Sequence, residues 1–180
     1  SVDNAVRRLG IEPIITSDAE TIRKADKGIF PGQGEAASTM AYLKVHKLDL
    51  LIKDLKQPVL GICIGMQIMC RHSEEGNVDC LGIFDTNVVK FHTDDKSLKI
   101  PQMGWNNISE LRSELFHGLE DGSYAYFIHS YHVPINEHTA AVTDYIHPYS
   151  SALHKDNYYA TQFHPEKRGK VGEMILRNFI

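Results

Sequence analysis

The residue best placed to do chemistry is Cys63, which lies in the run Gly61-Ile62-Cys63-Ile64-Gly65. The apolar run from Pro58 to Ile62 is typical of a strand buried on both faces, and a helical pattern begins at Ile64. A nucleophile at such a sharp strand-to-helix turn needs small neighbours, and glycines stand two residues away on either side. The N–H groups that open the helix favour a thiolate. The pattern predicts a cysteine nucleophile; a buried cysteine packed closely between glycines is the alternative.

A base and a carboxylate follow about a hundred residues later, in Gln162-Phe163-His164-Pro165-Glu166. We expect this run to end a strand, along which residues two apart share a face. His164 and Glu166 would then project together, so that the carboxylate holds the imidazole while its other nitrogen faces the sulfur. A lone His-Pro-Glu is usually a surface turn. Combined with the cysteine elbow, it favours a triad of Cys63, His164 and Glu166.

A third element is the glycine-rich turn Phe30-Pro31-Gly32-Gln33-Gly34, which follows a predicted strand. Its glycines allow the backbone to approach a ligand closely and to turn N–H groups inward. We expect Gly32 and Gln33 to form an oxyanion hole together with the N–H of Ile64. Rotation of the peptide between Gly32 and Gln33 would switch one donor on or off. A phosphate-binding loop is the weaker alternative, because GK[ST] is missing.

These groups must be positioned by alternating strands and helices. Before residue 73 we expect helices at 1–10, 18–25, 35–55 and 64–72, and strands at 13–16, 28–30 and 58–62. Further on we expect strands at 81–91, 125–133, 139–146 and 158–166, and a final helix at 171–180. The alternation predicts an α/β fold with a mostly parallel central sheet flanked by helices, plus a β-rich segment. We expect residues 1–180 to form one domain that lacks an initial strand upstream of Ser1.

Composition excludes several classes of function. The 180 residues carry a net charge of −4 without a basic stripe, which argues against nucleic acid as a partner. No apolar run approaches the roughly 20 residues of a membrane helix, and the start does not resemble a signal peptide. Three cysteines do not form a disulfide framework, so we expect a cytoplasmic protein. His129 and His132 lack a third ligand at a metal-binding spacing, and we predict neither metal nor cofactor.

The combination of motifs resembles a known family. PGQG, GICIGMQ and FHPE, in this order and at these separations, resemble the class I glutamine amidotransferases. PQMGWN from Pro101, FIHSY from Phe127 and HPEK from His164 narrow the resemblance to the glutaminase subunits of imidazole glycerol phosphate synthases. The resemblance spans essentially the whole chain. It implies a flavodoxin-like amidotransferase fold and the hydrolysis of glutamine to glutamate and ammonia through a cysteinyl thioester.

The resemblance also implies roles for further residues. The glutamine substrate would be bound by five residues, namely Gly34, Gln67, Glu75, Ser130 and Tyr131. Ammonia would pass to a cyclase partner, which is a (β/α)₈ barrel, in histidine biosynthesis. Four residues match positions that face this partner: Met103, Trp105, Asn106 and Lys167. For Trp105, packing in the core is an equal alternative, since tryptophan is frequent both in cores and at interfaces.

Some positions depart from the common pattern of this family. Gln102 stands where a histidine is usual, Arg168 replaces a serine after HPEK, and His132 replaces an aromatic residue. These departures bear on partner preference and leave the predicted triad unchanged. Two alternatives remain open: a glutaminase domain that serves a different synthase, and a catalytically silent binding module.

Overall fold

The apolar run before Cys63 forms the centre of the main sheet. The structure is a computed structural model that describes residues 1–32 and 34–180. Strand β2 (Val59–Ile62) is buried at all four residues and pairs in parallel with β1 (Gly28–Phe30) and with β11 (Tyr158–Thr161). Strands β10 (His147–Lys155) and β9 (Thr139–Tyr145) complete the order β1-β2-β11-β10-β9. Because both pairs involving β10 are antiparallel, four strands share one direction and only β10 opposes them.

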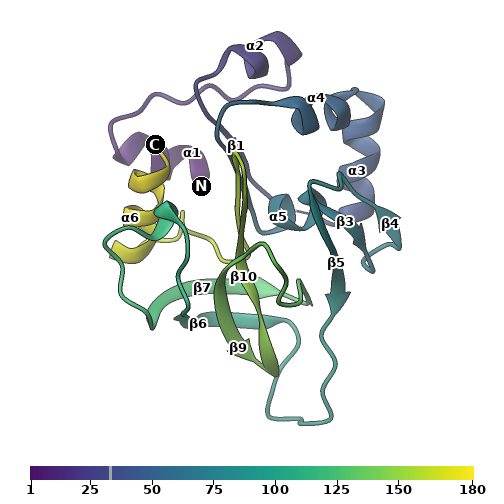
Figure 1. Ribbon diagram of the computed structural model, residues 1–180, viewed down its shortest axis with the longest axis vertical. Coiled ribbons are helices and arrows are strands. Elements are labelled where there is room, and N and C mark those ends of the chain that lie inside the picture. Colours follow the sequence, from purple (N-terminus) through teal and green to yellow (C-terminus); the bar gives the residue numbers. More distant parts are fainter. Residues whose placement is uncertain (33) are drawn as a thin grey trace.

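Helices cover both faces of this sheet (Figure 1). On one side lie α1 (Val2–Arg8) and α6 (Lys170–Phe179), and on the other lie α3 (Ala36–Val45), α4 (Leu48–Asp54) and α5 (Ile64–Met69). The pleat of β2 divides the core accordingly: Leu60 and Ile62 pack with α1 and α6, whereas Val59 packs with the other three helices. The short α2 (Ala19–Lys24) contacts α4. The core thus holds the end of β2 rigidly from two sides.

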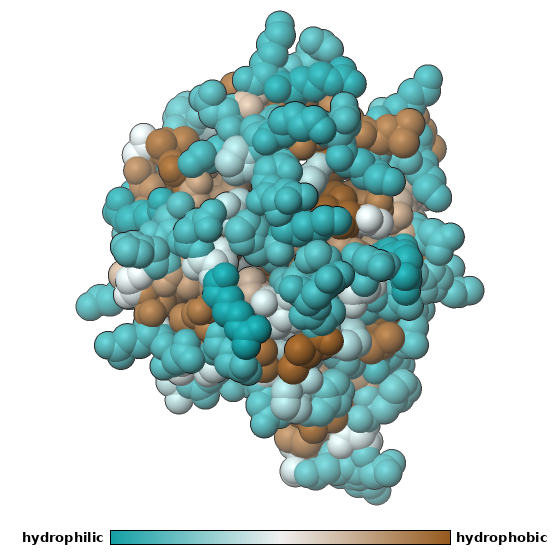
Figure 2. All heavy atoms as spheres, in the orientation of Figure 1, coloured by the Kyte–Doolittle hydropathy of each residue, from teal (hydrophilic) through white to brown (hydrophobic). Residues whose placement is uncertain are grey.

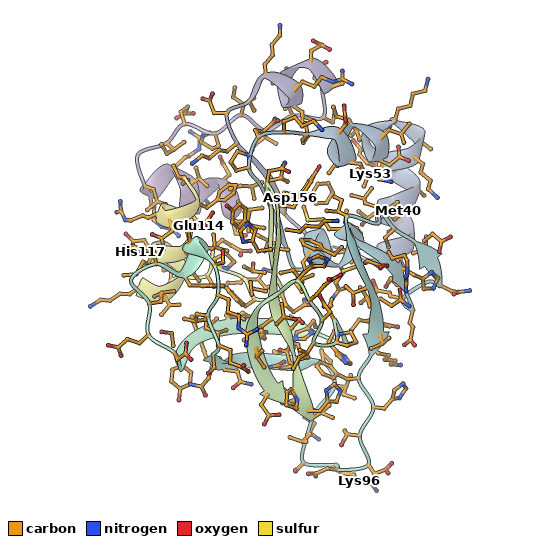
Figure 3. All side chains as sticks on the ribbon, viewed as in Figure 1. Met40, Lys53, Lys96, Glu114, His117 and Asp156 are labelled. Carbon is orange, nitrogen blue, oxygen red and sulfur yellow. The ribbon has the colours of Figure 1, made fainter. Side chains whose placement is uncertain are left out.

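Two smaller sheets extend the domain. One has the order β4-β3-β5-β8, formed by β3 (Cys70–Ser73), β4 (Val78–Asp79), β5 (Phe84–Lys90) and β8 (Tyr131–His132). The other is the antiparallel ribbon of β6 (Gln102–Ile108) and β7 (Ser123–His129), after which the chain passes through β8 to β9. A 3-10 turn, η1 (Glu114–Phe116), packs beside α6. The loop between β5 and β6 extends from the body with Lys96 at its tip (Figure 3).

The α/β class with helices on both faces of the sheet is confirmed. The face seen in Figure 2 is mainly hydrophilic, with hydrophobic side chains in separate groups. Within the described part of the chain, no helix is both long and apolar enough to cross a membrane.

Two expected helices are shorter than their sequence patterns suggested. The stretch 35–55 divides at Lys47, whose left-handed backbone (φ 58°) ends the first helix and lets α4 turn Leu48, Leu51 and Ile52 into the core. The helix expected at 64–72 ends at Met69, because residues 70–73 pair with β5 instead. Core packing in the first case and strand pairing in the second override helical propensity.

The strand expectations need several corrections. Residues 13–16 form no strand, and Ile14 and Ile15 are exposed; β-branched residues make a strand only where a partner strand pairs with them. The strand expected at 158–166 ends at Thr161, and the one expected at 125–133 is divided at Ser130 into β7 and β8. Strands β3, β4, β6 and β10 were not predicted; the sequences of β6 and β10 are broken by glycine, proline and polar residues. The strand expected upstream of Ser1 stays a prediction.

Candidate active site

The carboxyl ends of three parallel strands bring the predicted chemical groups to one edge of the sheet. Phe30 lies opposite Gly61, and Ile62 lies opposite Thr161, so β1, β2 and β11 end at the same level. The residues that follow these ends include Gly32, Cys63 and His164. This edge is where open α/β sheets bind their ligands.

Cys63 occupies a strained turn between β2 and α5. Its backbone has φ 56° and ψ −108°, which lies outside the regions that side chains adopt freely. The flanking positions have no room for any side chain, so both must be glycine. A Cβ added to Gly61 would lie 2.7 Å from the Gly65 carbonyl oxygen, and one added to Gly65 would lie 2.2 Å from the Phe30 carbonyl oxygen. The geometry is that of a nucleophile held on a sharp elbow.

The loop after β1 lies against the start of α5. Gly32 is buried, and a Cβ added to it would lie only 2.6 Å from the backbone nitrogen of Ile64. The Ile64 N–H opens the helix and has no partner within it. Gly32 and Ile64 are therefore close enough to act on one oxyanion. Gln33, the other expected member of the oxyanion hole, lies outside the described residues.

His164 and Glu166 meet in the turn that follows β11. His164 Nδ1 is 2.8 Å from Glu166 Oε2, and the two side chains are only 10% and 6% exposed. Since an ionised carboxylate only accepts hydrogen bonds, Nδ1 carries the proton and Nε2 is the nitrogen available to the sulfur. The backbone N–H of His164 donates to the Tyr126 carbonyl on β7, at 2.9 Å. A turn, and not the expected strand alternation, brings the pair together.

The surroundings of His164 favour its charged form. Burial of the ring is the largest influence and lowers the pKa, but the nearby Cys63 and the hydrogen-bonded Glu166 outweigh it and raise the pKa to about 9. Because this value lies above the ordinary 6.5, protonation of His164 stabilises the folded state fully below about pH 6.5. That contribution is lost as the pH rises through about 9. These neighbours therefore favour an imidazolium at His164 when Cys63 is a thiolate.

Removing the Cys63 sulfur should lower the pKa of His164. In Cys63→Ala only Glu166 would oppose the effect of burial, so we expect the His164 pKa to fall below its wild-type value of about 9. NMR titration of the ring protons measures the change. Cys80→Ala is the matched control, since the Cys80 thiol donates to the Val78 carbonyl and lies outside the triad. An unchanged titration in Cys63→Ala would show that the sulfur and the ring are not coupled.

The sequence analysis missed Gln162, which has the most direct polar contact with the sulfur. Gln162 Nε2 lies 3.7 Å from Cys63 Sγ, and its Oε1 accepts a hydrogen bond from Gln67 Nε2 at 2.9 Å. Gln67 Nε2 also donates to the Tyr131 carbonyl at 3.1 Å. Both N–H groups of Gln67 are therefore used within the protein, and only its Oε1 could serve the expected glutamine site. The position of Gln162 directly before Phe163 and His164 was the one signal in the sequence.

The other residues expected to bind glutamine lie along the same edge. Glu75 Oε1 accepts a hydrogen bond from the Ala36 N–H at 2.8 Å. Ala36 is the first residue of α3 and lies two residues after Gly34, so Glu75 is close to the expected glutamine-binding loop. Tyr131 begins β8, and its carbonyl also accepts from His129 Nδ1 at 2.7 Å. Ser130, which directly precedes Tyr131, is half-buried. The described residues contain no group of three or more histidine, cysteine or acidic side chains arranged to hold a metal ion.

Comparison with known proteins identifies the family. The model of the family described as glutamine amidotransferase class-I matches residues 1–180. The chain belongs to the class I glutamine amidotransferases. Among curated relatives, "Imidazole glycerol phosphate synthase subunit HisH" of Bacteroides fragilis (strain YCH46) is 62% identical over 180 residues, which is 100% of this chain and 92% of that protein. The protein of the same name from Escherichia coli (strain K12) is 46% identical over 182 residues, again covering 100% and 92%.

Solved structures with this amidotransferase fold are more distant in sequence. A crystal structure of a putative GMP synthase protein from Thermoplasma acidophilum aligns with a TM-score of 0.73 at 24% identity, covering 98% of this chain and 83% of the other. A crystal structure of a glutamine amidotransferase aligns with a TM-score of 0.75 at 17% identity, covering 99% and 89%. At these identities the likeness establishes the fold alone.

Three of the four residues expected at a partner interface of this amidotransferase share one region. Met103 and Trp105 on β6 are 63% and 54% exposed, so core packing of Trp105 is excluded. Lys167 Nζ lies 5.7 Å from the centre of the Tyr126 ring, which in turn contacts Trp105. Asn106 differs, because its amide donates to the Asp144 carbonyl at 3.2 Å and ties β6 to β9.

Two of the departures from the family pattern of this amidotransferase lie beneath that region. Gln102 is buried, and its Oε1 accepts from Tyr149 OH at 2.7 Å and lies 3.0 Å from His129 Nε2. His132 stacks on Phe91, with ring centres 4.3 Å apart. Burial lowers the pKa of His129 and of His132 to about 4, so both are neutral. These residues act as packing groups behind β7.

Proposed function

We propose that this chain is the glutaminase subunit of an imidazole glycerol phosphate synthase, which supplies ammonia to a cyclase subunit in histidine biosynthesis. The observation that carries the proposal is the 62% identity to a subunit HisH over the whole chain, together with a cysteine elbow, histidine and glutamate gathered at one sheet edge. Relatives of that name cover this chain completely in both Bacteroides and Escherichia.

The proposed reaction begins when Cys63 passes its thiol proton to His164 and the thiolate attacks the side-chain amide carbon of L-glutamine. The oxyanion that forms is stabilised by the Ile64 N–H and by the loop at Gly32 and Gln33. The His164 imidazolium protonates the departing ammonia, and a glutamyl thioester remains on the sulfur. Neutral His164 then takes a proton from water, which hydrolyses the thioester to glutamate. Glu166 keeps the ring oriented through both steps.

The proposed partner, a (β/α)₈ cyclase, would dock on the outer face of the β6–β7 ribbon. Strand β7 alternates between exposed and buried residues, and its pairing places Ile128 beside Met103 and Tyr126 beside Trp105 on the outer face. Aromatic residues and methionine grouped in this way are typical of interface cores. A small cavity of about 10 Å³ is lined by both Trp105 and His164, so the face and the base are neighbours.

The same strand gives such a partner a route to the catalytic residues. The Tyr126 carbonyl accepts from the His164 N–H, and the Ile128 carbonyl faces the Cys63 thiol at 3.9 Å. A shift of β7 on docking would therefore move the acceptors of both groups. We accordingly expect low glutaminase activity in the isolated chain and stimulation by the cyclase partner, most of all with the ligand of that partner bound. The stimulation requires contacts that differ between the two states of β7.

The direct test measures glutamate release from glutamine by the full chain, alone and with the cyclase partner. Growth without histidine of a bacterial strain that lacks its own subunit HisH tests the pathway. Glutaminase activity stimulated by a different synthase, with no rescue of growth, would favour the alternative of another acceptor. A chain that binds glutamine without hydrolysing it under any condition would be a silent binding module.

Trp105 should anchor the partner. We expect Trp105→Ala to raise the Kd for the cyclase partner by at least about 30-fold, because a buried tryptophan anchor contributes about 2 kcal/mol or more at interfaces. Isothermal titration calorimetry measures the change. Val45→Ala, on α3 and 78% exposed, is the control and should leave the Kd unchanged. Equal affinity of wild type and Trp105→Ala would place the partner elsewhere.

A further inference from the structure

A buried chain of two side-chain amides connects the sulfur of Cys63 to the backbone at Tyr131. Gln162 contacts the sulfur at 3.7 Å and Gln67 at 2.9 Å, and Gln67 reaches the Tyr131 carbonyl at 3.1 Å. Gln162 is completely buried and Gln67 is 3% exposed. Water therefore does not compete for these hydrogen bonds, and breaking one would leave a buried polar group without a partner.

The far end of this amide chain fixes which atom faces the sulfur. The Tyr131 carbonyl only accepts hydrogen bonds, so Gln67 must turn its NH₂ group toward it. The second N–H of the same group donates to Gln162, which must therefore accept through its Oε1. The NH₂ group of Gln162 is then left facing Cys63 Sγ. Reversing the Gln162 amide would set two NH₂ groups against each other and an oxygen against the sulfur.

The sulfur thus lies between an acceptor and a donor. The Ile128 carbonyl, at 3.9 Å, suits the neutral S–H, whereas the Gln162 N–H suits the thiolate. When the proton moves to His164, the contact with Ile128 loses its hydrogen and the contact with Gln162 becomes charge-assisted and stronger. We propose that Gln162 holds the Cys63 thiolate in place and favours its formation, and that Gln67 is a positioning residue that orients Gln162.

The proposal gives Gln67 a role besides the expected contact with substrate. Tyr131 and Ser130 belong to the proposed glutamine site, and the Tyr131 carbonyl is the fixed point that sets the polarity of both amides. Displacement of this segment would release Gln67, and through Gln162 it would change the environment of the sulfur. The state of the nucleophile is in this way linked to the backbone of the substrate site.

The test is the rate at which iodoacetamide alkylates Cys63 in the full chain, measured against pH without glutamine. Burial raises the pKa of Cys80 to about 11 and that of Cys70 far above its ordinary value, so Cys63 dominates near neutral pH. Cys63→Ala gives the background. We expect Gln162→Met to alkylate at least about tenfold more slowly at pH 7 and to shift the profile upward by about one pH unit or more.

The control is Gln57→Met, which removes a partly buried amide contact to the Ile22 carbonyl far from the sulfur and should leave the profile unchanged. Gln67→Met should shift the profile in the same direction as Gln162→Met. In glutaminase assays, which rest on the proposed function, Gln162→Met should lower kcat more than it raises KM. If the proposed function is wrong, only the glutaminase assay loses its meaning. The alkylation experiment still tests the role of Gln162, since it needs neither substrate nor partner.

An identical alkylation profile for Gln162→Met and wild type would overturn the proposal. If this variant does not fold, an NMR measurement on the wild-type protein still tests the proposal. The NMR signals of the Gln162 side-chain NH₂ should then titrate with the midpoint of Cys63 alkylation and lose this titration in Cys63→Ala. Signals that do not follow the sulfur would exclude the donor role.

Discussion

Replacing Cys63 by alanine should reduce glutamine hydrolysis by at least about 10⁴-fold, since the covalent step depends on this sulfur. The variant should fold as the wild type does, because alanine keeps the Cβ and the same elbow backbone. Cys63→Ser should be almost as inactive, as a hydroxyl is a far weaker nucleophile than a thiolate in a site arranged for sulfur. Steady-state glutamate release in the presence of the cyclase partner, with thermal unfolding recorded alongside, measures both effects.

Cys80→Ala and Cys70→Ala are the matched controls for this experiment. Burial raises the pKa of both thiols well above the ordinary value, so neither provides a thiolate at neutral pH. Both variants should keep glutaminase activity wherever they fold. Activity of Cys63→Ala close to that of wild type would refute the assignment of the nucleophile and, with it, the proposed reaction.

Glu166→Gln should lower kcat by roughly 10²- to 10⁴-fold, a severe but smaller loss than that expected for His164→Ala. The carboxylate accepts the Nδ1 proton of His164 and helps to raise the pKa of the ring. A glutamine amide keeps the shape but not the charge, so the ring would lose both its fixed tautomer and its tendency to hold a proton. The pH dependence of kcat should shift accordingly, with the essential acid lost at lower pH than in wild type.

Glu173→Gln on α6 is the control for this second experiment, since that carboxylate is 54% exposed and pairs with Arg177 at the surface. It should leave kcat and its pH dependence unchanged. A Glu166→Gln enzyme with wild-type kcat and pH profile would mean that the 2.8 Å contact with His164 is structural and has no part in the reaction.

Much of the candidate site followed from local sequence patterns. The alternation of short apolar runs with helical stretches predicted an α/β sheet, and the glycines around Cys63 predicted a tight turn between β2 and α5. Those signals are local because the chemistry demands particular residues at fixed offsets: small neighbours for an elbow, and a carboxylate near a histidine. The contact of His164 with Glu166 was expected for the wrong reason, since a turn and not a strand produces it.

The elements that the sequence analysis misplaced are those that depend on distant partners. Residues 13–16 are apolar and β-branched, yet they form no strand in the described structure, whereas the irregular sequence of β6 does so by pairing with β7. Lys47 divides a continuous helical pattern because α4 must turn its apolar residues toward the sheet. Propensity is a weak prior wherever burial or pairing can outweigh it.

The surroundings of the nucleophile were likewise decided by tertiary structure. Gln162 lies 99 residues from Cys63, and Ile128 lies 65 residues from it, but both contact the sulfur because β2, β11 and β7 converge on one edge. An amide or a backbone carbonyl has no sequence signature of its own, since either serves in any buried hydrogen bond. Residue types and spacing thus determined which groups could react. Only the packing of remote strands determined which neutral groups would orient them.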